Sequence, residues 1–224
     1  DGLEALPDLP LWLIANEFFD ALPIRQLIRR DSSWDEVVVT LDGAGRLCLG
    51  TRAAAPSLAP GGRTDWPAGS VVELAPAREA AMLALAQRLR TQGGYAVVID
   101  YGELEPGPGS TLQAVSGQAK VPPLTRPGEV DLTSRVAFAP LCRVARAAGV
   151  GVFGPVTQAA FLARLGGRVR LDRLRSTAAP ALAGRLERGY ARLTAAYGMG
   201  ELFKVLGLSA WPGIPPGFLP AEAS

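Results

Sequence analysis

Short continuous runs of apolar residues, each followed by polar residues, recur along the chain. One run covers Leu11 to Ala15 and is followed at once by Asn16 to Asp20. A second run covers Tyr95 to Ile99 and is followed by Asp100, Tyr101 and Gly102. An apolar run of this length that ends at polar residues is typical of a buried strand in a parallel sheet. Further strand candidates are Gly151 to Val156 and Glu201 to Leu208.

Alternating and β-branched residues mark a different kind of segment between residues 24 and 75. Trp34 to Leu41 alternates, and Asp42-Gly43 with Gly45 is a strong hairpin-turn signal before a return strand over Arg46 to Thr51. A loop rich in Pro, Gly and Ala follows, from Ala53 to Gly69. The pattern predicts a β-rich insertion over residues 24–75. Other short strand candidates are Arg25 to Arg30, Val71 to Leu74 and Thr111 to Val115.

Helical periodicity appears between the apolar runs. Pro76 begins a pattern that extends to about Arg90, and Gly93-Gly94 ends it just before the Tyr95 run. Further helices are predicted over Phe138 to Ala148, Thr157 to Leu165 and Thr177 to Tyr197, and an irregular loop over Val121 to Asp131. Helix, glycine turn, apolar strand and acidic tip in succession indicate an α/β fold. We expect residues 1–224 to form one α/β domain with the β-rich insertion.

Composition excludes several function classes. The net charge is +2, from 23 basic and 21 acidic residues, which gives no reason to expect a nucleic-acid or membrane surface. No apolar run approaches the length of a membrane span. The chain has no histidine, which removes Ser-His-Asp triads, histidine metal sites and imidazole acid–base chemistry. Cys48 and Cys142 both lie in apolar contexts, where two buried thiols are expected rather than a disulfide.

The polar residues behind the first apolar run are the first candidate site. Asn16, Glu17 and Asp20 follow that strand within five positions, where open α/β sheets bind ligands. Glu17 could accept hydrogen bonds from a cationic substrate or take a proton, and Asn16 could hold a carbonyl or amine. The alternative is that Asp20 caps a helix and Glu17 is a solvated loop residue. Phe18 and Phe19 could stack on a substrate, although core packing is the commoner use of such a pair.

Asp100 and Tyr101 form the second candidate. If the two apolar strands are parallel neighbours, Asp100 lies at the same sheet edge as Glu17, and two carboxylates there could bind a guanidinium. The alternative is an ordinary turn aspartate beside Gly102. A separate basic cluster could be a solvated face or a surface for an acidic partner. It comprises Arg164, Arg168, Arg170, Arg173 and Arg175.

Several of these segments resemble the motifs of the MidA-like (DUF185) methyltransferases, in the order in which that family has them. The longest is Ile14 to Pro23, which is similar to the family's ANEFFDALP signature. The other matching segments are Val98 to Gly102, Thr111 to Val115, Pro127 to Thr133, Thr157 to Leu162 and Met199 to Leu206. The family includes a mitochondrial protein arginine methyltransferase that assists assembly of respiratory complex I.

The resemblance implies a class I, Rossmann-like methyltransferase sheet with S-adenosyl-L-methionine as cofactor and a protein arginine as substrate. It makes Leu11 to Ala15 the fourth strand of that sheet and Tyr95 to Ile99 the fifth. On that basis Glu17 and Asp20 are expected to be catalytic and Asn16 to bind the cofactor, with no metal. Phe18, Asp100 and Tyr101 are expected to bind the substrate. The implied location is the cytoplasm of a bacterium or the mitochondrial matrix of a eukaryote.

The resemblance also has gaps. In the family, a glycine-rich loop that holds the cofactor precedes the fourth strand, so we expect this chain to lack that loop and to correspond to the later two-thirds of a family member. A histidine that usually follows the Thr111 to Val115 motif is absent, and Ser116 to Lys120 stands there. The alternatives are a non-catalytic protein-binding or assembly module of the same fold, or a methyltransferase acting on a small molecule. Exposed sheet edges also favour a homodimer.

Overall fold

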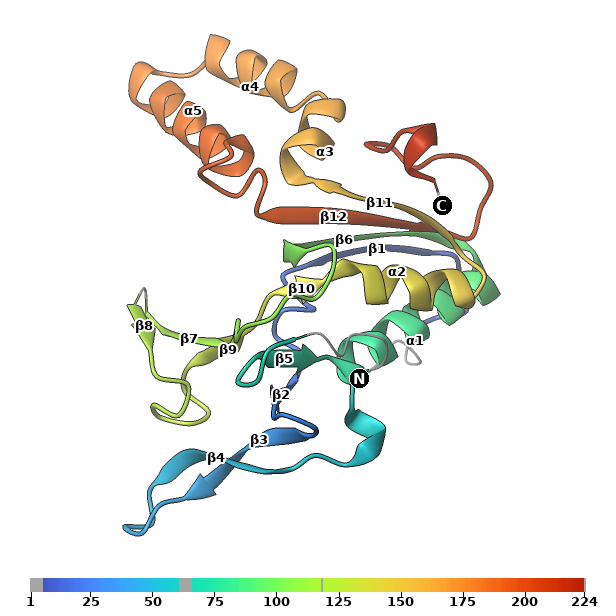
Figure 1. Ribbon diagram of the computed structural model, residues 1–224. Coiled ribbons are helices and arrows are strands. Elements are labelled where there is room, and N and C mark those ends of the chain that lie inside the picture. The colour runs from blue at the N-terminus through green and yellow to red at the C-terminus, as the bar shows by residue number, and fades with distance from the viewer. Residues whose placement is uncertain (1–5, 61–65, 118, 224) are drawn as a thin grey trace. The chain divides into compact units, whose positions relative to one another are not determined.

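The computed structural model describes residues 6–60, 66–117 and 119–223 (Figure 1). The chain divides into two compact units. The first comprises Asp1–Asp20, Glu79–Glu105 and Val136–Ser224, and the second comprises Ala21–Arg78 and Pro106–Arg135. The β-rich insertion predicted over residues 24–75 falls within the second unit, which also takes in the later segment.

A mixed sheet organises the first unit. Its strand order is β1 (Leu11–Asn16), β6 (Gly94–Glu103), β12 (Phe203–Ser209) and β11 (Gly151–Thr157). β1 and β6 are parallel, whereas β12 runs antiparallel to both of its neighbours. The two-residue strand β10 (Val136–Ala137) pairs in parallel with the last two residues of β6, Gly102 and Glu103. The parallel pairing predicted for the two apolar runs is confirmed, and so is the α/β fold class.

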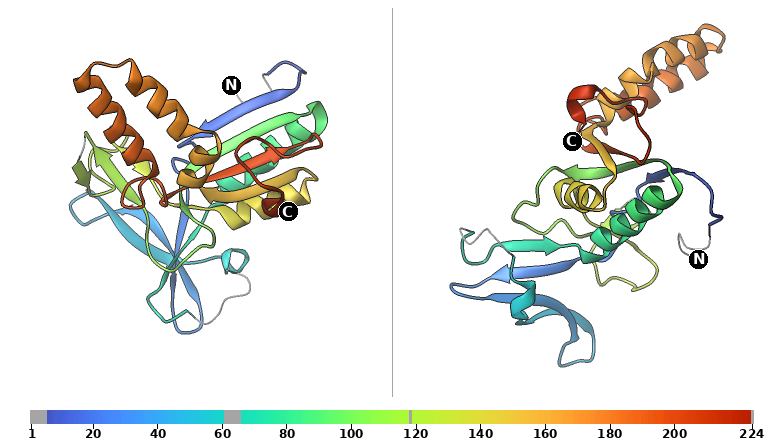
Figure 2. Two further views of the ribbon diagram at one scale, coloured as in Figure 1. Left: turned by 90° about the horizontal axis from the view of Figure 1, so that it is seen from above. Right: turned by 90° about the vertical axis from the view of Figure 1, so that its right-hand side faces the viewer.

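Helices cover both faces of this sheet (Figures 1 and 2). α1 (Pro76–Gln92) and α2 (Phe138–Ala147) lie on one face, and α3 (Gln158–Arg164) lies on the other with the C-terminal turn η3 (Pro220–Glu222). Two more helices, α4 (Gly167–Ser176) and α5 (Pro180–Thr194), follow α3 along the chain. β6 alternates between buried and half-buried residues, as expected for a strand with both faces covered. Its buried set on the α1 and α2 face includes Ala96, Val98 and Asp100.

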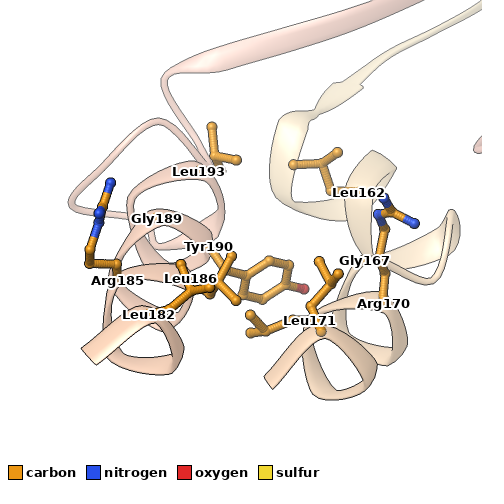
Figure 3. Close-up of a pocket in the computed structure, with 11 residues that line it drawn as sticks. Leu162, Gly167, Arg170, Leu171, Leu182, Arg185, Leu186, Gly189, Tyr190 and Leu193 are labelled. Carbon is orange, nitrogen blue, oxygen red and sulfur yellow. The ribbon is translucent and has the colours of Figure 1, made fainter. Parts of the chain in front are cut away.

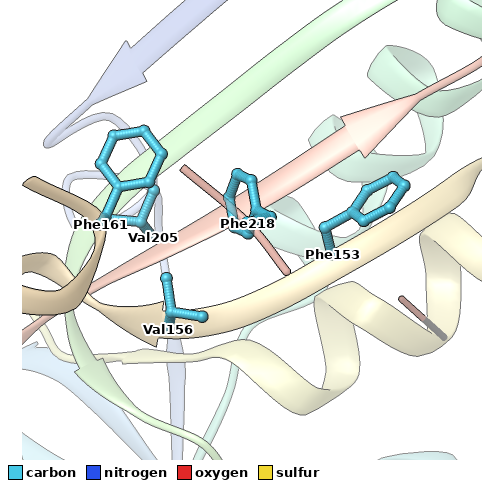
Figure 4. Packing of buried hydrophobic residues seen from close by; sticks show 5 residues of the cluster. All are labelled: Phe153, Val156, Phe161, Val205 and Phe218. Carbon is cyan, nitrogen blue, oxygen red and sulfur yellow. The ribbon is translucent and has the colours of Figure 1, made fainter. Parts of the chain in front are cut away.

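An aromatic cluster holds the C-terminal segment on the second face (Figure 4). Phe218 lies between Phe161 and Phe153, with ring centroids 5.4 and 6.1 Å away, and all three are buried. Gly207 of β12 makes room for the ring, since a Cβ atom at this position would lie 2.7 Å from Phe218. The segment after β12 is therefore docked by its own apolar side chain.

The second unit holds two small antiparallel sheets. One has the order β4 (Leu47–Ala53), β3 (Trp34–Leu41), β2 (Arg25–Arg29) and β5 (Val71–Leu74), and the other β8 (Ala119–Val121), β7 (Gln113–Ser116) and β9 (Asp131–Thr133). A short 3-10 turn, η2 (Pro56–Leu58), lies in the loop after β4. Glu73 of β5 ties the unit together, because its carboxylate accepts hydrogen bonds from Gln26 Nε2 and Thr111 N, both at 2.8 Å.

Several sequence expectations need correction. The Leu11 to Ala15 run was expected to be buried, yet Trp12 and Ile14 are 71% and 75% exposed. Both side chains point to the face of edge strand β1 that no helix covers (Figure 2). The last helix begins at Pro180 and ends at Thr194, and the last strand begins at Phe203. α4 was missed, since its sequence offers only Leu171 and Leu174 as apolar positions at helical spacing. The irregular loop expected over Val121 to Asp131 is confirmed, and only its first and last residues belong to strands, β8 and β9.

Gly94→Ala is expected to lower the free energy of unfolding by about 3 kcal/mol. Gly94 has φ 120°, and a Cβ atom there would lie 2.0 Å from the carbonyl oxygen of Leu11, its partner in β1. The methyl group would push β1 away from β6. Urea unfolding measures the effect, with Gly189→Ala as control, because a Cβ atom on this α5 glycine meets nothing within 4 Å. Equal stability of Gly94→Ala and wild type would contradict the observed β1–β6 register.

Candidate functional site

The candidate residues lie side by side where β1 ends, with Asp100 and Tyr101 in the last part of β6, which continues to Glu103. Asn16, the last residue of β1, is opposite Ile99 of β6. The next backbone N–H, that of Glu17, donates to the carbonyl oxygen of Ile99 at 2.9 Å. Asp100 follows Ile99 directly, so Asn16-Glu17 and Asp100-Tyr101 share one sheet edge, as the two apolar runs predicted.

Asp100 fastens the turn that follows β1. Its Oδ2 atom accepts hydrogen bonds from the backbone N–H groups of Phe19, at 3.0 Å, and Asp20, at 3.2 Å. Its Oδ1 atom accepts from the N–H group of Tyr101 at 2.9 Å. Asp100 is 0% exposed. Both carboxylate oxygens are therefore used inside the protein, and in this arrangement Asp100 holds a loop instead of meeting a ligand.

Burial also changes the ionisation of this carboxyl group. Loss of hydration, with a smaller contribution from the nearby charge of Asp20, raises the pKa of Asp100 to about 7, even though three backbone N–H groups favour the charged form. Asp20 is itself buried, at 4% exposure. A pair of acidic side chains thus lies beneath the turn, where one proton changes the local charge near neutral pH.

Asn16, Glu17 and Phe18 face outward from the same turn. Glu17 has φ 50°, a left-handed conformation that is uncommon for a residue with a side chain. Asn16 Nδ2 donates to Glu17 Oε1 at 3.2 Å. Phe18 is 50% exposed and contacts Phe19 edge to face, with ring centroids 5.4 Å apart, while Phe19 is buried. Phe19 anchors the turn, and the three residues before it are presented at its surface.

The alternative in which Asp20 caps a helix is wrong, because the turn leads directly into β2 at Arg25. Glu17 is exposed, as the alternative of a solvated loop residue also required. The basic cluster predicted over residues 164–175 lies on α3 and α4, the two helices that follow β11 along the chain.

Two residues at the site were missed from the sequence. Phe203 and Lys204 begin β12 and lie opposite Tyr101 and Asp100 in the antiparallel register. The rings of Tyr101 and Phe203 are 5.8 Å apart. Burial lowers the pKa of Lys204, whose Nζ donates to the carbonyl oxygen of Glu201. The sequence predicted a strand here, over Glu201 to Leu208, and Met199 to Leu206 resembles a family motif, but nothing in the spacing shows that β12 runs antiparallel and reaches the site.

Within residues 6–60, 66–117 and 119–223, no group of acidic or cysteine side chains is arranged to hold a metal ion. In the same part of the chain, no helix combines the length and apolar character needed to cross a bilayer.

The site belongs to a chain with clear relatives. The mitochondrial protein arginine methyltransferase NDUFAF7 homologue of Drosophila melanogaster is 32% identical over 219 residues, which cover 95% of this chain and 49% of the relative. The mitochondrial protein arginine methyltransferase NDUFAF7 of Bos taurus is 33% identical, over 92% of this chain and 47% of the relative. The chain therefore spans about half the length of the curated relatives it matches.

Solved structures agree with the sequence relatives. A crystal structure of a Burkholderia thailandensis protein bound to S-adenosyl-homocysteine superposes with a TM-score of 0.83 at 26% identity, covering 97% of this chain and 58% of the other. A native crystal structure from the same organism gives the same TM-score and covers 60% of the other chain. The sequence profile of a family described as putative S-adenosyl-L-methionine-dependent methyltransferase matches residues 1–156. With the strand arrangement and the Ile14 to Pro23 turn, these matches show that the chain belongs to the MidA-like family of S-adenosyl-L-methionine-dependent methyltransferases.

Proposed function

We propose that this chain supplies the substrate-orienting part of a protein arginine methyltransferase. The observation that carries the proposal is the turn after β1, which presents Asn16, Glu17 and Phe18 outward while Phe19, Asp20 and Asp100 anchor it from within. Ligands of open α/β sheets bind outside the carboxyl ends of the strands, which is where this turn lies. The arginine in this proposal comes from the similar proteins, which are protein arginine methyltransferases. The exposed carboxylate of Glu17 would suit any cationic group.

The exposed residues suit the chemistry of the family's cofactor. S-adenosyl-L-methionine, when bound, supplies an activated methyl group on its sulfonium. The protein must then orient a nitrogen nucleophile and accept its proton. Glu17 can do both for a guanidinium, since a carboxylate makes charge-assisted, bidentate hydrogen bonds with it. We assign Asn16 to the cofactor, because its amide can both donate and accept hydrogen bonds at this edge. Phe18 offers a half-exposed ring against which a guanidinium can stack.

The acidic residues near the turn differ in burial, since Glu17 is exposed whereas Asp20 and Asp100 are buried. Asp20 and Asp100 were expected to be catalytic and substrate-binding, but both are enclosed by protein, and Asp100 uses both its oxygens for backbone N–H groups. We therefore propose that Asp20 and Asp100 are positioning residues, which fix Glu17 by fixing the turn beneath it. Tyr101 is half-buried against Phe203 and is proposed to line the substrate side of the same edge.

Methyl transfer to matched peptides tests the proposal. The natural protein is incubated with tritiated S-adenosylmethionine and a library of peptides that each contain one arginine, beside the same peptides with lysine in its place. We expect tritium in a subset of the arginine peptides and none in their lysine counterparts. Equal labelling of both sets would overturn the guanidinium assignment. Absence of transfer to any arginine peptide would favour the non-catalytic assembly module instead.

A further inference from the structure

An apolar groove runs between the helices that follow β11. These helices are remote in sequence from the turn that follows β1. It has a volume of about 460 Å³ and lies between α4 and α5, with α3 at one end (Figure 3). Leucine side chains make up most of its walls. Its lining residues are Leu162, Gly167, Arg170, Leu171, Leu174, Leu182, Arg185, Leu186, Gly189, Tyr190 and Leu193.

The groove leaves several of its leucine side chains exposed. Leu171 is buried between the helices, but Leu174, Leu182 and Leu193 are 41%, 47% and 40% exposed. Scattered exposed leucines are ordinary, whereas several that share one concave surface mark a binding site. α5 has 15 residues, so the groove can accompany a partner helix for about 22 Å, or four turns.

The charge around the groove is strongly positive. α4 and α5 carry seven of the chain's 23 basic residues and two of its 21 acidic residues, so these two helices hold +5 in a chain whose net charge is +2. The two acidic residues, Asp172 and Glu187, are already engaged by Arg168 and Arg175 at 2.7 to 3.1 Å. Arg170 and Arg185 line the groove, and the described part of the chain shows no ion pair for either.

We propose that this groove docks an acidic amphipathic helix of a partner protein, with its apolar residues between the leucines and its carboxylates beside Arg170 and Arg185. A helix that lays apolar residues into a groove at spacings of three and four is a common mode of peptide recognition. Charge complementarity selects the partner, because a second copy of this chain would bring another +5 surface to the same place. The apolar walls explain why the basic cluster is more than a solvated face.

Two synthetic peptides provide the probe. Both are helical and share leucines at positions i, i+3, i+4 and i+7, and one carries glutamate and the other lysine at the flanking positions. Fluorescence anisotropy measures their binding to the whole chain in the absence of S-adenosylmethionine. The result is therefore independent of whether methyl transfer occurs. We expect the glutamate peptide to bind at least about 10-fold more tightly than the lysine peptide, and the difference to shrink at high salt.

Filling the groove should remove this binding without unfolding the helices. A side chain added at Gly189 meets no atom within 4 Å at its Cβ position, so Gly189→Trp can occupy the groove. We expect it to weaken the glutamate peptide by at least about 10-fold. Gly184→Trp is the matched control on the same helix, because Gly184 lies outside the groove lining and meets only the flexible end of Arg188. Equal loss of binding in both variants would overturn the proposal.

Charge reversal separates the groove from the general field of the helices. Arg170→Glu with Arg185→Glu changes two lining residues, and Arg173→Glu with Arg188→Glu makes the same change in net charge on the same helices outside the lining. We expect only the first pair to reverse the preference for the glutamate peptide over the lysine peptide.

Other occupants would give different results. Self-association that Gly189→Trp abolishes, seen in sedimentation, would show a second copy in the groove and overturn the proposal. Binding to vesicles of anionic phospholipid that competes with the glutamate peptide would instead indicate a membrane surface, and would overturn it as well.

Discussion

Glu17→Gln is expected to lower the rate of methyl transfer by about 100-fold or more, with little change in stability. Positioned acid–base groups contribute about 10²- to 10⁴-fold to a reaction rate. The glutamine keeps the size of the side chain and an Oε1 atom for the hydrogen bond from Asn16, so the turn should persist. What it loses is the negative charge that attracts a guanidinium and the ability to accept its proton. Steady-state transfer to the best arginine peptide measures the effect.

A matched acidic residue tells this effect apart from a general change in charge. Glu105 is exposed on the same unit and lies outside the turn, so Glu105→Gln should leave transfer unchanged. A third variant separates chemistry from folding. Glu17→Gly relieves the φ 50° conformation and should raise the free energy of unfolding by about 1 kcal/mol, yet it should lose transfer as Glu17→Gln does. Full activity of Glu17→Gln would remove Glu17 from the site.

The sequence was sufficient for the parts of the site that depend on local patterns. The runs Leu11 to Ala15 and Tyr95 to Ile99 carried enough information to pair as parallel strands, because an apolar run that ends at polar residues is typical of such strands. The burial expected for the first run was nevertheless wrong. The Asp42-Gly43 pair also predicted the β3–β4 hairpin correctly, because these residues favour a tight turn between two strands. In each case neighbouring residues determine the structure.

The rest depended on contacts between distant segments. Nothing near Asp100 in the sequence shows that it accepts hydrogen bonds from Phe19 and Asp20, which lie about 80 residues earlier. The sequence therefore indicated an acidic site residue where the structure has a buried anchor. The antiparallel direction of β12, which brings Phe203 and Lys204 to the site, is likewise set by its two neighbouring strands. α4 packs against α5, a contact that its own polar sequence does not show.

The anchoring role of Asp100 predicts an unusual dependence of stability on pH. In the unfolded chain the pKa of this aspartate is near 3.8, and in the folded chain burial raises it to about 7. Between these values the folded chain holds a proton that the unfolded chain has released, so raising the pH favours unfolding. The contribution of this group is complete below about pH 4 and is lost as the pH rises through about 7. A difference of about three pKa units corresponds to about 4 kcal/mol.

Asp100→Asn isolates this contribution, because the asparagine does not titrate. Its amide oxygen can still accept from Phe19 and Asp20, but its NH₂ group then faces the Tyr101 N–H group, which costs about 1 to 3 kcal/mol at every pH. Urea unfolding should therefore find the variant less stable than wild type at pH 5 and equal to it or more stable at pH 8. Parallel stability curves over this range would contradict the raised pKa. They would mean that the three N–H groups keep the buried carboxylate charged throughout, and that the turn beneath Glu17 is fixed by an anion rather than by a neutral carboxyl group.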